Sequence, residues 1–488
     1  MRYALLAAVA PFLPGLALGV RPRLSPSQLP CCGVARTERR ELLVCGTAHT
    51  PCRSAAEVSA VIRSTKPDVV VLELDQERLE RLLRGRYASS AERQYGEDFA
   101  AAVEAADAVD APIILGDAKA RDTLAALRAP GPVADGARIS RAVQLALRPI
   151  GDGIDSSTAA TVALQPVSVL GSLVDDVGKL LPLLAGLWWA LALSAFTLVL
   201  PASAAYSTPP MESWVLMALS SVGVAAVLAA SVRAIDVVLL SRDEVLASSA
   251  LRGLELAAGL RSGQLLRRRY KFSTVPSVLA AAPAPPSDLL PFFTLRKPLA
   301  RGEMRRLNLF EPRWLCLLDT LAAAHAPGKS TADGLVGATF GCVFAANRYY
   351  APAGDGWDGD GARTADVVLR PLARRARVVR VEASRRPVSG DRRLEVWIVG
   401  DEPLRIDADS LRATGRGFLA GRVAPCTEAE YADGQCLGAV ASTAADTEAP
   451  ASPIRVVSVV GLAHANGVLD RCAESGLEDA AVEWPSKS

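Results

Sequence analysis

Two histidines follow glycines at the ends of strand-like apolar runs, and histidine suits both proton transfer and metal binding near neutral pH. The first run ends at Gly46 and is followed by His49, and the second ends at Gly461 and is followed by His464. The chain has only three histidines. The Gly-x-x-His arrangement that two of them share indicates a common role at the ends of two buried strands.

Charged side chains mark the ends of the other apolar runs. Glu73 stands inside a valine-rich run, where a buried carboxylate is costly unless it is paired, protonated or bound to a cation. Asp117 closes a short isoleucine-rich run, and Arg78 lies close enough to Glu73 in the chain to reach back over the strand end. Arg242 and Asp243 follow a further aliphatic run. These residues are therefore candidates for a site at the strand ends.

Two imidazoles and a carboxylate can form a metal site. Neutral ring nitrogens and a carboxylate oxygen suit manganese, cobalt or zinc, and the predicted ligands are His49, His464 and Glu73. Asp117 or Asp243 would be a further ligand, a partner of a ligand or a base. A metal-bound water in such a site can attack a carbonyl group.

The arginines have a catalytic and a structural interpretation. Arg78 or Arg242 can stabilise a developing oxyanion or hold a carboxylate. The structural alternative is that Glu73 and Arg78 form an ion pair and that each histidine caps a helix or fills a polar pocket. Both interpretations stay open from spacing alone.

The elements that must position these residues are predicted as alternating strands and helices. Ser54 and Glu57 have the spacing of a capping box at a helix start. The segments 69–74 and 112–117 read as short buried strands, with a helical stretch at 97–109 between them. Right-handed crossovers between such strands give a parallel sheet, whose carboxyl ends meet at one edge. We therefore expect the candidate residues to converge there.

Hydropathy predicts a membrane segment. The mean hydropathy is +0.23, and the runs 180–200 and 214–232 carry no charge. Two such runs are typical of a transmembrane hairpin, and the positive flanks Lys179 and Arg233 place both body segments on the cytosolic, stromal or matrix side. The formal net charge of +2 gives no indication of a nucleic-acid partner.

The first forty residues read as a signal or transit leader. An apolar run up to residue 20 is followed by a basic, serine-containing stretch without acids before Glu38. With the predicted hairpin, this favours an organelle membrane, of a plastid or mitochondrion, over the alternative of the secretory pathway or the endoplasmic reticulum membrane.

The predicted fold class is α/β, a mostly parallel sheet with flanking helices that is interrupted by a transmembrane helical hairpin and an α+β insertion. The insertion contains a helix near 314–324 and a β-hairpin built from 377–382 and 394–399. The predicted segments are a leader (1–40), the first part of the α/β domain (41–128), a connector (129–179), two transmembrane helices (180–232), the middle part of the domain (233–275), the insertion (276–452), and the last strand and tail (453–488).

Three stretches, 41–128, 236–260 and 453–470, resemble the TraB/PrgY family. The matching motifs are Gly46-Thr47-Ala48-His49, Ser54-Ala55-Ala56-Glu57-Val58, Lys66-Pro67-Asp68, Glu73-Leu74 with Arg78, Leu115-Gly116-Asp117, Ser241-Arg242-Asp243, and Gly461-Leu462-Ala463-His464 with Gly467. The chain departs from the family pattern at Ala118, where arginine is usual, and at Ser241, where glutamate is usual.

The resemblance implies an α/β fold related to the Tiki-type metalloproteases and the EreA/ChaN-like group, with paired Gly-x-x-His motifs and a glutamate in metal-dependent peptide hydrolysis. Two function hypotheses follow. The first is a membrane-anchored, metal-dependent peptidase, and the second is a non-catalytic organelle-membrane factor that binds a peptide or protein or tethers membranes. The oligomeric state cannot be derived from these patterns.

Overall fold

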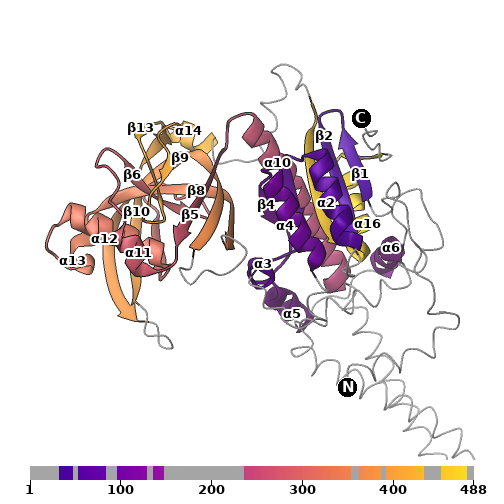
Figure 1. Cartoon of the computed structure of the whole chain (residues 1–488), viewed down its shortest axis with the longest axis horizontal. Helices are drawn as coiled ribbons and strands as arrows, with labels where there is room; N and C mark the ends of the chain where they lie inside the picture. The colour runs from indigo at the N-terminus through magenta and orange to yellow at the C-terminus, as the bar shows by residue number, and fades with distance from the viewer. Residues whose placement is uncertain are drawn as a thin grey trace, which may run out of the picture.

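Two β-sheets, each with its own helices, make up the described part of the chain in this computed structural model (Figure 1). The structure describes residues 32–47, 53–83, 96–128, 136–147, 236–352, 362–385, 392–433 and 452–480. The first sheet combines segments from both ends of the chain, whereas the second is built from the region between them.

The first sheet has six strands and carries the candidate residues. In spatial order its strands are β15 (Glu478–Ala480), β1 (Cys32–Thr37), β2 (Arg40–Thr47), β14 (Ile454–Gly461), β3 (Val69–Leu72) and β4 (Ile113–Leu115). Strands β2, β14, β3 and β4 run parallel, while β1 pairs antiparallel with both β2 and β15. Strand β14, from near the end of the chain, therefore lies between two strands from its start.

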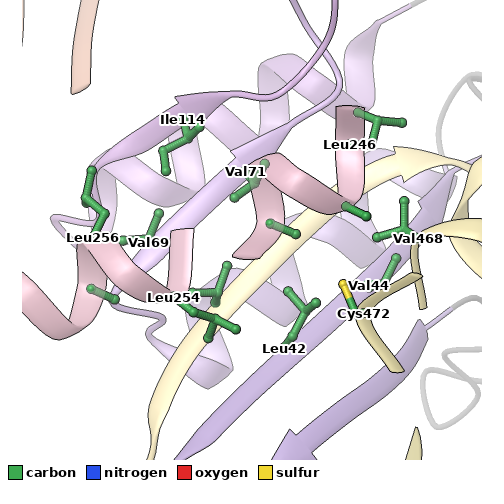
Figure 2. Close-up of a cluster of buried hydrophobic side chains, with 14 of the residues drawn as sticks. Leu42, Val44, Val69, Val71, Ile114, Leu246, Leu254, Leu256, Val468 and Cys472 are labelled. Atoms are coloured by element: carbon green, nitrogen blue, oxygen red, sulfur yellow. The ribbon is translucent and has the colours of Figure 1, made fainter. Parts of the chain in front are cut away.

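Helices cover both faces of the first sheet. On one face lie α10 (Ser241–Arg261), which a π-helical turn η3 (Asp236–Leu240) precedes, and α16 (Leu462–Glu474); on the other lie α2 (Arg53–Thr65) and α4 (Glu97–Ala108). The helices α3 (Gln76–Leu83), α5 (Ala120–Arg128) and α6 (Gly136–Leu147) also belong to this part of the structure. Alternate strand residues point to opposite faces: Leu42 and Val69 pack beside Leu254 of α10 (Figure 2), whereas Leu43 and Val70 pack under α2 and α4. Burial on both faces explains why these strands are continuous apolar runs.

The second sheet has nine strands and lies between α10 and β14 in the sequence. Its path is β11 (Arg412–Ala413), β12 (Leu419–Gly421), β6 (Leu290–Leu295), β8 (Thr339–Pro352), β9 (Ala362–Arg385), β10 (Arg392–Ile406) and β13 (Val423–Pro425), while β5 (Leu266–Ser273) pairs with β9 and β7 (Met304–Leu309) with β10. Its helices are α11 (Pro276–Ala281), α12 (Pro312–His325), α13 (Thr331–Leu335) and α14 (Glu428–Asp433). Only the β6–β8 pair is parallel among the described strands of this sheet.

Polar contacts join the two sheets. The Asn347 side chain on β8 donates a hydrogen bond to the carbonyl of Ile113 on β4 at 2.8 Å. Arg269 on β5 pairs with Asp107 of α4 at 2.7 Å and with the buried Asp366 of β9 at 3.3 Å. The nine-stranded sheet is therefore held against the strand that ends at the candidate site.

The fold-class prediction is wrong as a description of this chain. The first sheet is mixed because β1 and β15 pair antiparallel at its edge, and the second sheet is almost entirely antiparallel. Over the ranges that the structure describes, no helix combines the length and the apolar character needed to cross a membrane. The runs 180–200 and 214–232, on which the hairpin prediction rested, lie outside the described residues.

Candidate functional site

Glu73 directly follows β3 and is almost completely buried, with 1% of its surface exposed. One carboxylate oxygen, Oε2, accepts the amide hydrogen of Gly461 at 2.5 Å, and the other, Oε1, lies 2.6 Å from a guanidinium nitrogen of Arg242. Since Gly461 ends β14, Glu73 ties together the carboxyl ends of two parallel neighbours. The cost of burying this charge is offset by a cation and a backbone donor.

Arg242 is the central cation of the site. It lies at the start of α10 and binds Asp117 with two nitrogens, Nε at 2.9 Å and Nη2 at 2.6 Å, while Nη2 also pairs with Glu73. Such a two-pronged arrangement matches the planar guanidinium to the carboxylate and is stronger than a single neutral hydrogen bond. Arg242 therefore connects the ends of β3 and β4 to α10.

Arg78 supplies the second cation. It lies in α3, whose first turn is capped by Asp75: the Arg78 amide donates to Asp75 Oδ1 at 2.8 Å. Its guanidinium pairs with Asp117 at 2.8 Å. With 20% of its side chain exposed, against 12% for Arg242, Arg78 is the more solvent-accessible of the two arginines.

His464 and Asp243 form a buried pair next to this network. The ring nitrogen Nδ1 of His464 lies 2.6 Å from Oδ1 of Asp243, and Nε2 lies 3.9 Å from Oε1 of Glu73. His464 belongs to the first turn of α16, which begins directly after β14, and Asp243 belongs to the first turn of α10. Two helix starts therefore deliver the pair to the same edge of the sheet.

A glycine makes this close approach possible. A Cβ atom at Gly467 would lie 1.9 Å from Oδ2 of Asp243, far inside van der Waals contact. Gly467 is one helical turn beyond His464, so the Asp243 carboxylate rests against the backbone of the helix that carries the histidine. Only glycine leaves room for this arrangement.

Burial and charge shift the acid–base properties of two members of the site. Burial raises the pKa of the Asp243 carboxyl above its ordinary value, and this effect outweighs the hydrogen bond with His464, which lowers the pKa. Burial alone would lower the pKa of Arg242, but the negative charges of Glu73 and Asp117 raise it above its ordinary value. Arg242 is therefore a permanent cation in the site.

The structure brings together six of the predicted site residues, namely Glu73, Arg78, Asp117, Arg242, Asp243 and His464. Gly46 pairs in register with Val460, and Gly461 with Thr47, so the two motif glycines lie on neighbouring strands. His49 lies outside the described residues.

The prediction of a metal site is wrong for the part of the chain that the structure describes. Within it, no group of three or more His, Cys, Asp or Glu side chains is arranged to hold a metal ion. The physical reason is that Glu73 faces the Arg242 guanidinium and Asp243 faces Nδ1 of His464, so these oxygens already face cationic or N–H groups.

Two residues with clear roles in the geometry were not among the predicted site residues. Asp75 caps α3 and thereby positions Arg78, and an aspartate just before a helix is a recognisable capping signal. Gly467 stands in the last motif that resembles the TraB/PrgY family, but its role has no local signal, because the clash that it avoids involves Asp243, which is 224 positions earlier in the numbering.

No protein-family model and no curated protein matches the chain. Among solved structures, the chain is similar to the Lon N-terminal domain protein from Xanthomonas campestris, with 19% identity and a TM-score of 0.19 over 28% of this chain and 60% of that chain. It is also similar to the N-terminal domain of Mycobacterium avium complex Lon protease, with 12% identity and a TM-score of 0.16 over 29% of this chain and 55% of that chain. The chain thus spans 60% or less of these two structures, and similarity at this level does not establish a shared fold.

Proposed function

We propose that the carboxyl edge of the first sheet is a hydrolytic site for peptide bonds, with His464 as general base. The observation that carries the proposal is the buried His464–Asp243 pair, in which Nδ1 is held by Asp243 at 2.6 Å. This contact orients the ring and leaves Nε2 to take a proton from water. The resemblance of the Gly46 and Gly461 motifs to the TraB/PrgY family supports a peptide as the substrate class.

The charges around His464 suit the proton transfer that hydrolysis requires. As water attacks the carbonyl carbon, Nε2 takes one of its protons, and Asp243 together with the nearby Glu73 stabilises the positive ring. The ring then gives this proton to the departing amine, and the new carboxylate keeps the oxygen from water. The N-terminal end of α16, which begins at the same edge of the sheet, carries positive dipole charge that favours negative charge on the carbonyl oxygen. Arg78, the more exposed of the two arginines, favours this negative charge as well.

A second candidate function is a non-catalytic peptide- or protein-binding factor. The observation that favours it is that both arginines of the site are already paired with carboxylates, as expected of a network that braces α3 and α10 against β3 and β4. In this case the network would maintain a binding surface, and replacement of His464 would leave peptide binding unchanged. The predicted organelle location stays a prediction under either function.

The test is cleavage of a defined peptide mixture, such as a tryptic digest of casein, followed by mass spectrometry. The wild-type chain, His464→Ala and the control His325→Ala are compared; His325 is an exposed residue at the end of α12. Because general acid–base groups contribute about 10²- to 10⁴-fold to rates, His464→Ala should lose at least about 100-fold in cleavage rate. Cleavage that is equal in wild type and His464→Ala, or absent from all three, would refute the hydrolase.

A further inference from the structure

Two cysteines face each other across the first two strands of the first sheet. Cys32 on β1 is in register with Cys45 on β2, and their sulfur atoms are 3.1 Å apart. Both residues are buried, with 7% and 2% of their surface exposed. A disulfide requires a sulfur–sulfur distance of about 2.05 Å, so a small rotation of the two side chains would close the bond without movement of the strands.

We propose that Cys32 and Cys45 form a redox-active pair that a small-molecule disulfide oxidises to an intramolecular disulfide. One of the two thiols loses its proton and attacks a sulfur of the oxidant, which forms a mixed disulfide and releases one thiol of the oxidant. The second cysteine then loses its proton, attacks the sulfur of the first and releases the other thiol. The protein loses two protons and two electrons, and the oxidant is reduced to two thiols.

The surroundings of the pair determine how readily this exchange occurs. The hydrogen bond with Cys45, followed by burial, raises the pKa of the Cys32 thiol well above its ordinary value. Since the thiolate is the attacking species, oxidation should be faster as the pH rises. The bond would join β1 to β2 just before Gly46, the first motif glycine, and would close a loop between two positions that are 13 apart in sequence.

The experiment uses the full chain in the background Cys31→Ser, Cys52→Ser. This background is needed because trypsin releases Cys31 together with Cys32, and Cys45 together with Cys52. The protein is held with oxidised glutathione until its thiol state no longer changes, and a second sample is unfolded in urea and refolded with the same oxidant, so that burial does not protect the thiols. Remaining thiols are alkylated in denaturant, and the tryptic peptides are identified by mass spectrometry.

The expected result is a linked pair of peptides containing Cys32 and Cys45, two hydrogens lighter than the separate peptides and separated by dithiothreitol. Oxidation should also raise the melting temperature, and Cys45→Ser should abolish both effects. Cys342 is the internal control, because it is a buried thiol whose strand neighbour on β9 is Arg374. It should remain a thiol in both samples and therefore be recovered in its alkylated form. Alkylation of both Cys32 and Cys45 after both treatments, or pairing of Cys45 with other cysteines as often as with Cys32, would overturn the proposal.

Discussion

Replacement of Arg242 by methionine tests whether the charge network holds the site together. Methionine replaces the apolar stem of the arginine side chain but removes the guanidinium cation, which lies 2.6 Å from Glu73 and 2.6 Å from Asp117. Both carboxylates are buried, with side-chain exposures of 2% and 4%. Without the guanidinium they remain as negative charges in a medium of low polarity, which is the main cost of the substitution.

The magnitude follows from what remains after the change. Removing one partner of a buried ion pair costs about 3–5 kcal/mol. Asp117 keeps Arg78 at 2.8 Å, and Glu73 keeps the Gly461 amide at 2.5 Å, so we expect the lower end of this range. With a urea dependence of about 2 kcal/mol per M, a loss of about 3 kcal/mol lowers the unfolding midpoint by about 1.5 M.

The assay is urea unfolding followed by far-ultraviolet circular dichroism, with Arg261→Met as the matched control. Arg261 lies in the same helix and binds Asp68 with two nitrogens at 2.7 Å, but 35% of its side chain is exposed. An exposed pair of this kind contributes at most about 1 kcal/mol. If Arg242→Met shifts the midpoint no further than Arg261→Met does, the network does not stabilise this edge and the reasoning is refuted.

Three further predictions concern neighbouring features. Gly467→Ala should destabilise the protein by about 1–3 kcal/mol, because the new methyl group would overlap Asp243. The ring ¹⁵N chemical shifts of His464 should then show the loss of the hydrogen bond at Nδ1. The control Gly136→Ala, where nothing lies within 4 Å of the new methyl group, should be neutral or stabilising. Because the pKa of Asp243 is raised in the folded state, ionisation of this carboxyl disfavours folding. As the pH rises from about 4 through the raised pKa, the unfolding free energy of wild type should therefore fall relative to that of Asp243→Asn, by up to about 1.4 kcal/mol per pH unit. A difference between the two proteins that does not change with pH would contradict this. Asp366→Asn leaves Arg267, 2.7 Å away, without its buried anion. The free energy of unfolding, measured with urea, should fall by about 3 kcal/mol, and proteolysis between the two sheets should become faster. An unchanged urea midpoint and an unchanged digestion rate would contradict this.

The four parallel strands could be located from the sequence because they are buried on both faces. Strands of this kind are continuous apolar runs, and a glycine or acid marks their ends, as at Gly46 and Asp117. Given alternation of strands and helices, the convergence of Glu73, Asp117 and His464 follows from topology. The convergence of these candidate residues could therefore be predicted from the sequence, although the strand order and directions of the whole sheet could not.

The antiparallel edge could not be recognised in the same way. Strand β1 ends in exposed polar residues, and it lies inside the segment that the sequence assigns to a leader. Strand β15 has only three residues, too few to show a period. Strand β15 is defined by its partner, since Glu478 pairs in register with Arg36, and a pairing over such a long sequence distance is invisible in a local pattern. The pairing of β1 with β2 is local, with Thr37 opposite Arg40, but the leader prediction covered β1 and the turn of this hairpin.

Within the described residues, the prediction of a metal site failed for a related reason. Residue types suggested that Glu73 and the histidines hold a metal, but a buried carboxylate can be compensated equally well by a guanidinium. The choice between the two depends on Arg242, which is 169 positions beyond Glu73 in the numbering and reaches it only through the packing of α10 on the sheet. The spacing of residues along the chain therefore does not reveal that Arg242 and Glu73 lie close together.

The central claim is that His464, oriented by Asp243, takes a proton from the water that cleaves a peptide bond. The most direct measurement is kcat for peptide cleavage by Asp243→Asn relative to wild type, with circular dichroism to verify the fold. Asparagine keeps the size of Asp243 but removes the charge that stabilises the protonated ring, so we predict a kcat at least about 100-fold lower. A kcat within about twofold of wild type, well below the smallest contribution expected of such a group, would contradict the account.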